Sequence, residues 1–281
     1  MTAPLAIIAG NGDLPLEIAH RLTQRGEDIF VCAIAGEASE KLKAYPNAFL
    51  EWGQVGKLFK LLQQHKINRV MLAGGVVGRP EFSITKMDLG TMLTLPGLLG
   101  TLLAGDNEIL TGVISIFEKR GFEVCSVPQI LPELIASEGA MTKARPRGED
   151  RDRISYGAEL TRTLGPYDVG QACVVIGKRA VAIEGVEGTD AMLQRIVEMR
   201  QIGRLPRRRC GVLIKAMKPD QSEKADLPAI GPATVQAVAD ANLLGIGVEA
   251  GKAIVLDRPT VLQKARELGI FVFGFPPPKP A

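Results

Sequence analysis

The feature that most constrains the fold is an alternation of short apolar runs with amphipathic segments across the first half of the chain. Four apolar runs have the length of buried strands, namely residues 5–9, 29–33, 70–73 and 122–127. Three segments carry apolar residues at helical spacing, beginning at residue 14 and covering 55–65 and 106–120. Strand and helix in series predict an α/β fold with a parallel sheet covered on both faces.

The second half has a different pattern, and a segment dense in charge precedes it. We expect a first domain over residues 1–136, a linker over 137–153 and a second domain over 154–281. The expected elements of the second domain are helices over 154–164 and 260–268, a hairpin over 172–183, and strands over 211–216 and 271–275. This mixture predicts a mixed α/β domain.

Composition argues against a nucleic-acid partner. The formal net charge is only +3, from 34 Lys and Arg against 31 Asp and Glu, and aromatic residues make up 5% of the chain. A phosphate-backbone binder needs a strongly basic face, and a single-strand binder needs aromatic stacking surface. The four cysteines lie far apart without a C-x-x-C pair, which excludes a zinc knuckle and indicates buried apolar residues.

The longest apolar stretch, Met87–Gly105, contains Asp88, several glycines and Pro96, which argues against a membrane span. A core helix pair is preferred over helices that lie against lipid. The first residues show no basic leader followed by a long apolar run, so we expect no export. A chain that is not exported is expected in the cytoplasm, and a net charge this small argues for no more than peripheral contact with a membrane.

Two glycine turns follow predicted strands. Gly10 and Gly12 precede a helix, and Gly74 and Gly75 end the third strand, where small residues let backbone N–H groups approach a phosphate. An ordinary strand-to-helix turn explains the first of them equally well. A dinucleotide fingerprint would need a third glycine where Pro15 stands, so a nicotinamide-dependent oxidoreductase is disfavoured. Asp106, at a predicted helix start, suits N-capping better than ligand binding.

The segment from Ile183 to Arg195 is the richest in chemistry. Glu184, Glu187 and Asp190 surround a glycine-rich bend, and three carboxylates in that setting suit coordination of a hard cation by oxygen. Gly188 and Thr189 offer an N–H and a hydroxyl group to a phosphate. An alternative is that Asp190 only caps the helix that begins here.

Two lysines leave a predicted strand further on. Lys215 and Lys218 are spaced so that both reach a diphosphate, and Asp226 is placed to bind a metal or polarise a water molecule. Solvated loop lysines are the alternative. His20 and His65 are the only histidines, and the sequence has neither a nucleophile elbow nor a P-loop. Phosphoryl chemistry with a divalent cation, lysines and carboxylates is what this chain can supply.

These segments resemble the LpxI family. The strongest motifs are IAGNGDLP at 8–15, EGTDAML at 187–193 and DLPAIGP at 226–232. Shorter ones follow in the family's order, namely LAGG at 72–75, GDN at 105–107, DVGQA at 168–172 and KPDQ at 218–221. The resemblance therefore runs over nearly the whole chain.

The resemblance implies a Rossmann-like N-terminal domain on the nucleotide side and a catalytic, lipid-binding C-terminal domain. Family members are pyrophosphatases that hydrolyse UDP-2,3-diacylglucosamine to UMP and 2,3-diacylglucosamine 1-phosphate (lipid X) in lipid A synthesis of Gram-negative bacteria, with a divalent cation, expected to be Mg²⁺. A non-catalytic binder of a nucleotide-linked lipid is the rival hypothesis. No oligomeric state is predicted.

The resemblance also assigns roles to residues. Asp226 is expected to be the essential acidic residue, with Lys215 and Lys218 beside it, and Glu184, Glu187 and Asp190 remain metal candidates. The expected substrate-binding residues are Gly10, Asn11, Gly12, Leu14, Gly74, Gly75, Val76, Asp106, Gln171, Gly188, Thr189 and Gln221.

Overall fold

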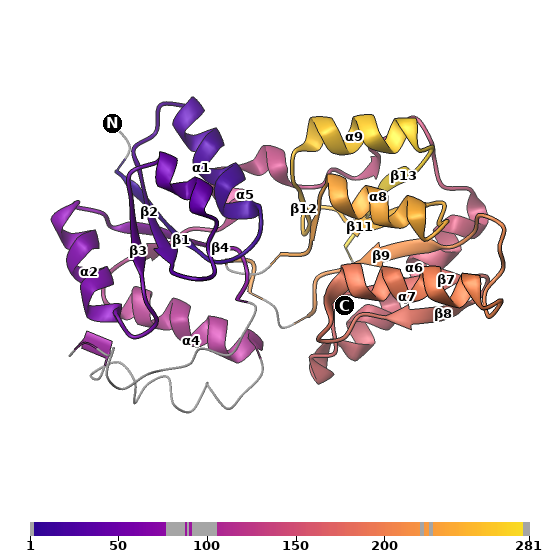
Figure 1. The fold of residues 1–281 in the computed structure, drawn as a ribbon, viewed down its shortest axis with the longest axis horizontal. Coiled ribbons are helices and arrows are strands. Elements are labelled where there is room, and N and C mark those ends of the chain that lie inside the picture. Colours follow the sequence, from indigo (N-terminus) through magenta and orange to yellow (C-terminus); the bar gives the residue numbers. More distant parts are fainter. Residues whose placement is uncertain are drawn as a thin grey trace. The chain divides into compact units, whose positions relative to one another are not determined.

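The computed structural model describes residues 3–76, 88, 90–91, 106–219, 222–224 and 227–277 (Figure 1). Most of the apolar stretch 87–105, together with Gln221 and Asp226, lies outside the described residues. The chain divides into two compact units. The first contains residues 1–131 and 222–226, and the second contains 132–221 and 227–281.

The first unit is built on a parallel sheet, as the apolar runs predict. Its strands are β1 (Leu5–Ala9), β2 (Ile29–Ile34), β3 (Asn47–Leu50), β4 (Arg69–Ala73) and β5 (Glu123–Val124). They lie in the order β3-β2-β1-β4-β5, and every neighbouring pair is parallel. Because β2 and β4 flank β1 on opposite sides, the direction of winding reverses at β1, which is where such sheets bind ligands.

Helices cover both faces of this sheet (Figure 1). The main ones are α1 (Leu14–Gln24), α2 (Val55–Gln64) and α4 (Asp106–Lys119), with the short α5 (Val127–Ile130) after β5. Phe59 of α2 and Phe117 of α4 pack with Val70 on one face, and α1 covers the other. One predicted boundary needs correction, because the strand expected over 122–127 ends at Val124 and α5 begins at Val127. Asp13 holds the N-cap position of α1 without a side-chain capping bond.

A residue distant in sequence caps helix α2. The Asp88 carboxylate accepts hydrogen bonds from the N–H groups of Gly56, at 3.0 Å, and Lys57, at 2.8 Å. Burial by itself would raise the pKa of Asp88, but hydrogen bonds from Thr91, Lys57 and Gly56 outweigh it and lower that pKa below its ordinary value. The ionised carboxylate therefore satisfies N–H groups that have no acceptor within the helix.

The second unit contains a mixed sheet, as predicted. Its strands are β6 (Gly139–Ala140), β7 (Ala172–Ile176), β8 (Arg179–Ile183), β9 (Val212–Lys215), β11 (Gly245–Glu249) and β13 (Phe271–Phe275). Their order is β6-β13-β11-β9-β7-β8, with β13, β11 and β9 parallel and the outer pairs antiparallel. The predicted hairpin joins β7 and β8 through Gly177. A separate parallel pair joins β10 (Ala229–Ile230) and β12 (Ile254–Val255).

Four helices cover the mixed sheet. They are α6 (Gly148–Leu164), α7 (Gly188–Gln201), α8 (Pro232–Asp240) and α9 (Arg258–Glu267). One face packs against α7, α8 and α9 through residues such as Leu193, Val235 and Val261, and the other packs against α6 through Ile154. Helix α6 begins six residues before the predicted start, so residues 148–153 of the expected linker over 137–153 are helical. Strand β6 takes up two further residues of that segment, 139–140.

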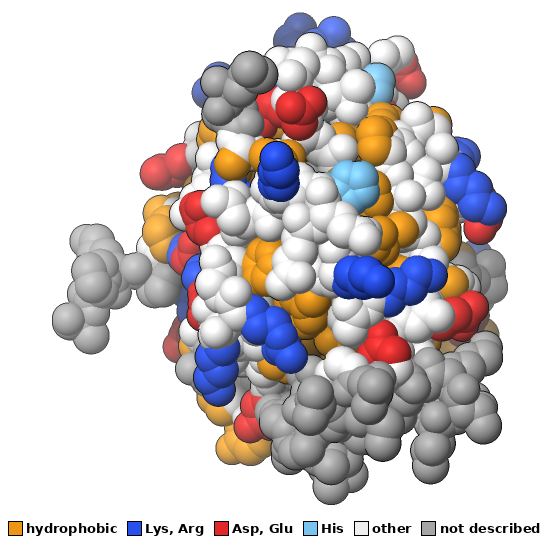
Figure 2. Space-filling view, turned by 90° about the vertical axis from the view of Figure 1, so that its left-hand side faces the viewer, with side chains coloured by type: hydrophobic (Ala, Val, Ile, Leu, Met, Phe, Trp, Pro, Cys, Tyr) orange, Lys and Arg blue, Asp and Glu red, His pale blue; other side chains and the backbone are white. Residues whose placement is uncertain are grey.

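Basic and acidic side chains are interspersed on the face of the first unit that Figure 2 shows, and the described residues of that face form no broad basic surface.

All four cysteines are buried, as the sequence predicts. Burial raises the pKa of Cys32 to about 12 and that of Cys173 to about 11, so these thiols stay protonated.

Among the described residues, no helix combines the length and the apolar character needed to cross a bilayer.

Candidate functional site

The two glycine turns of the first unit lie against each other at the point where the sheet reverses its winding. Asn11 N donates to Gly75 O at 2.7 Å, and Gly75 N donates to Asn11 O at 3.1 Å. A Cβ on Gly10 would lie 2.2 Å from Gly75 O, and one on Gly74, whose φ is +83°, would lie 2.3 Å from Asn11 O. Glycine is required at both positions because the two backbones approach so closely.

This pairing determines which N–H groups a phosphate can reach. The amides of Gly10, Asn11 and Gly75 already donate to backbone oxygens, and Gly12 N donates to Asn11 Oδ1 at 2.6 Å. Asn11, Gly12 and Val76 are exposed, and Leu14 begins α1 half-buried. The two turns therefore meet at one edge of the sheet. Nucleotide binding by these residues stays a prediction, and it relies on the exposed N-terminus of α1 rather than on the paired amides.

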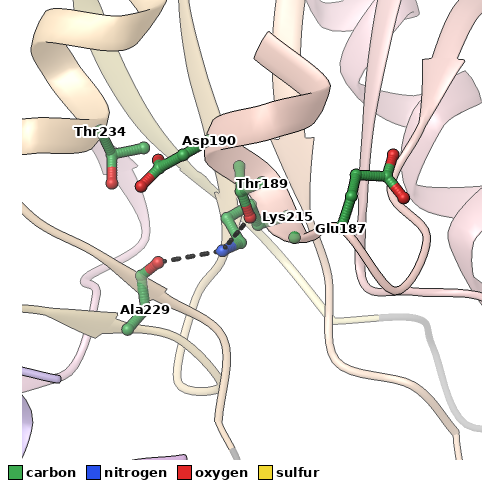
Figure 3. Close-up of a pocket in the computed structure, with 7 residues that line it drawn as sticks. Glu187, Thr189, Asp190, Lys215, Ala229 and Thr234 are labelled. Carbon is green, nitrogen blue, oxygen red and sulfur yellow. Dashed lines mark hydrogen bonds between the residues drawn. The ribbon is translucent and has the colours of Figure 1, made fainter. Parts of the chain in front are cut away.

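A pocket of about 290 Å³ opens in the second unit (Figure 3). The residues that line it are Glu187, Gly188, Thr189, Asp190, Lys215, Ala229 and Thr234. They come from the N-terminus of α7, the carboxyl end of β9, strand β10 and the first turn of α8. Three residues that the sequence singled out for an anion, Gly188, Thr189 and Lys215, are thus brought together from segments 26 residues apart.

Lys215 is the centre of this pocket and is only 6% exposed. Its Nζ donates to Thr189 Oγ1 at 2.9 Å and to Ala229 O at 3.1 Å. The Thr189 hydroxyl in turn donates to Glu184 Oε1 at 2.6 Å. Because an ammonium group at the start of a helix adds its charge to that of the helix dipole, this wall of the pocket favours an anion.

Glu184 lies behind the pocket wall and is 7% exposed. Its second oxygen, Oε2, accepts from Gln171 N at 3.0 Å. Both carboxylate oxygens are therefore used to hold groups of the protein, the Thr189 hydroxyl and the start of β7. Gln171 is placed by this contact beside the site, although it does not line the pocket.

The three predicted metal ligands do not form one set. Glu187 is paired with Arg195, with 2.5 Å between its Oε1 and Nη2 of the arginine. A hydrogen bond from its own backbone N–H and the nearby Arg195 guanidinium lower the pKa of Glu187. Its carboxylate points away from Lys215, whereas Asp190 points toward Thr234 (Figure 3). No group of three or more His, Cys, Asp or Glu that could hold a metal ion occurs within the described ranges.

Lys218 does not line the pocket that contains Lys215. The Lys218 ammonium group is paired with the Asp168 carboxylate, and its residue is not among those that line the cavity. Asp106 is the first residue of α4, in the first unit. Gln221 and Asp226 lie outside the described residues, so their roles rest on the sequence.

Sequence reasoning missed two residues of the pocket, Ala229 and Thr234. Ala229 offers its backbone oxygen to Lys215, and the Thr234 hydroxyl accepts from Gly231 N at 3.2 Å, where α8 begins. Both belong to or follow the motif DLPAIGP, and the Gly-Pro pair there is a helix-start signal. From that signal the sequence could have predicted a helix start at Pro232, whose first turn contributes Thr234 to the pocket.

Two family models together match nearly the whole chain. The LpxI N-terminal domain matches residues 4–134, and the LpxI C-terminal domain matches residues 137–273. A curated relative, the UDP-2,3-diacylglucosamine pyrophosphatase LpxI of Caulobacter vibrioides, is 38% identical over 274 residues, which are 97% of this chain and 98% of that protein. A solved structure of the CobK precorrin-6A reductase aligns with a TM-score of 0.31 and 11% identity, covering 100% of this chain and 90% of that one. From the two domain models and the full-length relative, the chain belongs to the LpxI family.

Proposed function

We propose that this protein hydrolyses the diphosphate of UDP-2,3-diacylglucosamine to UMP and 2,3-diacylglucosamine 1-phosphate in lipid A synthesis. The observation that carries the proposal is the 38% identity to the Caulobacter enzyme of that activity over 97% of the chain. The pocket adds support, because its buried ammonium group and helix N-terminus suit a diphosphate.

The proposed reaction gives each of these residues a different role. Lys215 stabilises the negative charge that develops on diphosphate oxygens as the bridging P–O bond breaks. The Thr189 N–H in the first turn of α7 assists it, whereas Gly188 N already donates to Gly185 O at 3.2 Å. Glu184 keeps Thr189 oriented toward Lys215. Asp226 is assigned to polarise the attacking water, and Lys218 to a secondary contact with the substrate.

A divalent cation is a separate part of the proposal. Glu184 and Glu187 are already bound to other groups, and the three candidate carboxylates do not surround one point. This part of the chain therefore does not fit the expected metal site, and no step of the reaction is assigned to the ion.

The direct test is UMP release from UDP-2,3-diacylglucosamine by the purified protein, with Mg²⁺ and with a chelator. We expect release by the parent protein, and loss of release in Asp226→Ala because the attacking water is no longer polarised. Activity that survives chelation would remove Mg²⁺ from the proposal and leave the hydrolase.

A matched control for that variant is Asp240→Ala, an Asp at the end of α8 whose carboxylate accepts from Gln236 Nε2 at 2.9 Å. It should release UMP at the parental rate. Substrate that stays bound without UMP release by the parent would contradict the hydrolase and favour the rival hypothesis of a binding protein.

We also propose peripheral contact with the membrane that holds the substrate. Tyr167, Val169 and Val186 are large apolar side chains that the structure leaves exposed, Tyr167 at 77%. They belong to one edge of the second unit, because Gly170, which follows Val169, lies against Glu184, two residues before Val186. Burying such side chains in lipid is favourable by about 1.5–3 kcal/mol each.

Sedimentation with anionic phospholipid vesicles tests this contact. We expect Tyr167→Ser with Val186→Ser to weaken vesicle binding by about tenfold or more, because two apolar side chains are lost. Ile202→Ser is the control, since Ile202 is also exposed, at 72%, but follows the opposite end of α7. Equal weakening by the control would contradict a contact at the Tyr167 edge.

A further inference from the structure

Glu249 is a buried carboxylate that the account of the pocket leaves unused. It is the last residue of β11 and is 4% exposed. Its Oε2 accepts from Met217 N at 3.1 Å, and its Oε1 lies 3.7 Å from Nη2 of Arg162, in the last turn of α6. Glu249 therefore contacts the chain two residues after Lys215.

The chain that leaves β9 is held from both neighbouring strands. On the β7 side, Ala216 N donates to Gln171 O at 3.0 Å, and on the β11 side Met217 N donates to Glu249. These two contacts follow Lys215 directly, at the point where β9 ends. A shift of residues 216–217 would move the Lys215 ammonium group, because Lys215 is the last residue of β9 and its side chain reaches the pocket from there.

The fold alone does not favour a carboxylate here. Burial raises the pKa of Glu249, while the Arg162 guanidinium and the Met217 N–H lower it, and burial dominates. A raised pKa means that the ionised form is less favoured in the folded chain than in the unfolded chain, so at neutral pH the ionised group weakens the fold. Buried groups of this kind are concentrated at functional sites.

We propose that Glu249 is a positioning residue for the reaction proposed above. It accepts a hydrogen bond from Met217 N and so holds residues 216–217, which follow β9, and with them the ammonium group of Lys215. The function resides in the acceptor oxygen. Glutamine keeps such an oxygen and alanine does not, which separates this role from one that needs the negative charge.

Steady-state kinetics with UDP-2,3-diacylglucosamine provide the first measurement. Glu249→Ala should lower kcat by about 10–100-fold with little change in KM, because a displaced group loses transition-state contact more than substrate binding. Glu249→Gln should stay within about threefold of the parent, since one acceptor for the Met217 N–H remains. Equal losses in the two variants would overturn the proposal.

A second measurement, hydrogen exchange of peptides that cover residues 212–218, does not depend on activity. Glu249→Ala should exchange faster at 216–218, and Glu249→Gln should exchange like the parent. The matched control is Asp150→Ala, also 4% exposed, whose carboxylate accepts from Arg147 N at the start of α6. It should speed exchange near residue 147 and leave both kcat and residues 212–218 unchanged.

The two measurements separate the two proposals. A parent that releases no UMP overturns the proposed function, and faster exchange in Glu249→Ala would then still support the contact with β9. Unchanged exchange, or faster exchange with parental kcat, overturns the positioning role while the hydrolase stands.

Discussion

Lys215→Met should lower kcat/KM for UDP-2,3-diacylglucosamine by about 10²–10³, a typical loss when one preorganised donor to a developing oxyanion is removed. Lys215 is 6% exposed and its ammonium group donates to Thr189 and Ala229, so the group is already oriented before substrate binds. Methionine keeps most of the side-chain volume without the charge. UMP release at saturating and at low substrate concentrations would measure the loss.

Two further lysine variants make the test specific. Lys178→Met changes an exposed lysine in the β7–β8 turn and should keep parental kinetics. Lys218→Met should cost less than Lys215→Met, because the Lys218 ammonium group is paired with Asp168 and does not line the pocket. A larger loss for Lys218→Met than for Lys215→Met would contradict the assignment of the pocket.

Arg200→Met should lower the free energy of unfolding by about 3–5 kcal/mol, because it leaves buried carbonyl groups without a donor. Arg200 lies in the last turn of α7 and is 7% exposed. Its guanidinium group donates to five backbone oxygens, those of Pro206, Arg208, Cys210, Ala241 and Asn242. It thus joins the end of α7 to the loop before β9 and to the end of α8.

Urea unfolding of the full chain would measure this change, with Arg204→Met as the control. Arg204 is exposed and only four residues away, so its loss should change the free energy of unfolding by less than about 0.5 kcal/mol. Similar midpoints for Arg200→Met and the parent would show that water satisfies the five carbonyl groups after the arginine is removed.

The fold could be predicted where periodicity was strong. Strands β1, β2 and β4 are nearly continuous apolar runs, and each is buried between two layers of helices. Strand β3 was missed because Asn47–Leu50 has only four residues, of which only Leu50 is buried. The predicted first residue of helix α6 was too late in the chain, because the first turn of the helix is charged rather than apolar. That turn is held by Asp150, whose carboxylate accepts from Arg147 N.

The site could be predicted in part. The helix start at Gly188 and Thr189 was visible as a glycine followed by polar residues, and Lys215 as a lysine ending an apolar strand. The role of Glu184 was not visible, because its partner Gln171 is brought beside it by the pairing of β7 with β8. Spacing suggested three metal ligands, but the side chains of Glu184 and Glu187 have other partners. Glu249 carried no local signal, since its contact with Met217 spans 32 residues.

The most direct test of the central claim is the appearance of both products from UDP-2,3-diacylglucosamine, compared between the parent and Lys215→Met at equal folded protein. The account predicts equimolar UMP and 2,3-diacylglucosamine 1-phosphate from the parent, and at least tenfold slower release of both from the variant. Equal rates from the two proteins would contradict the pocket around Lys215 as the place of the reaction, and absence of both products would contradict the hydrolase itself.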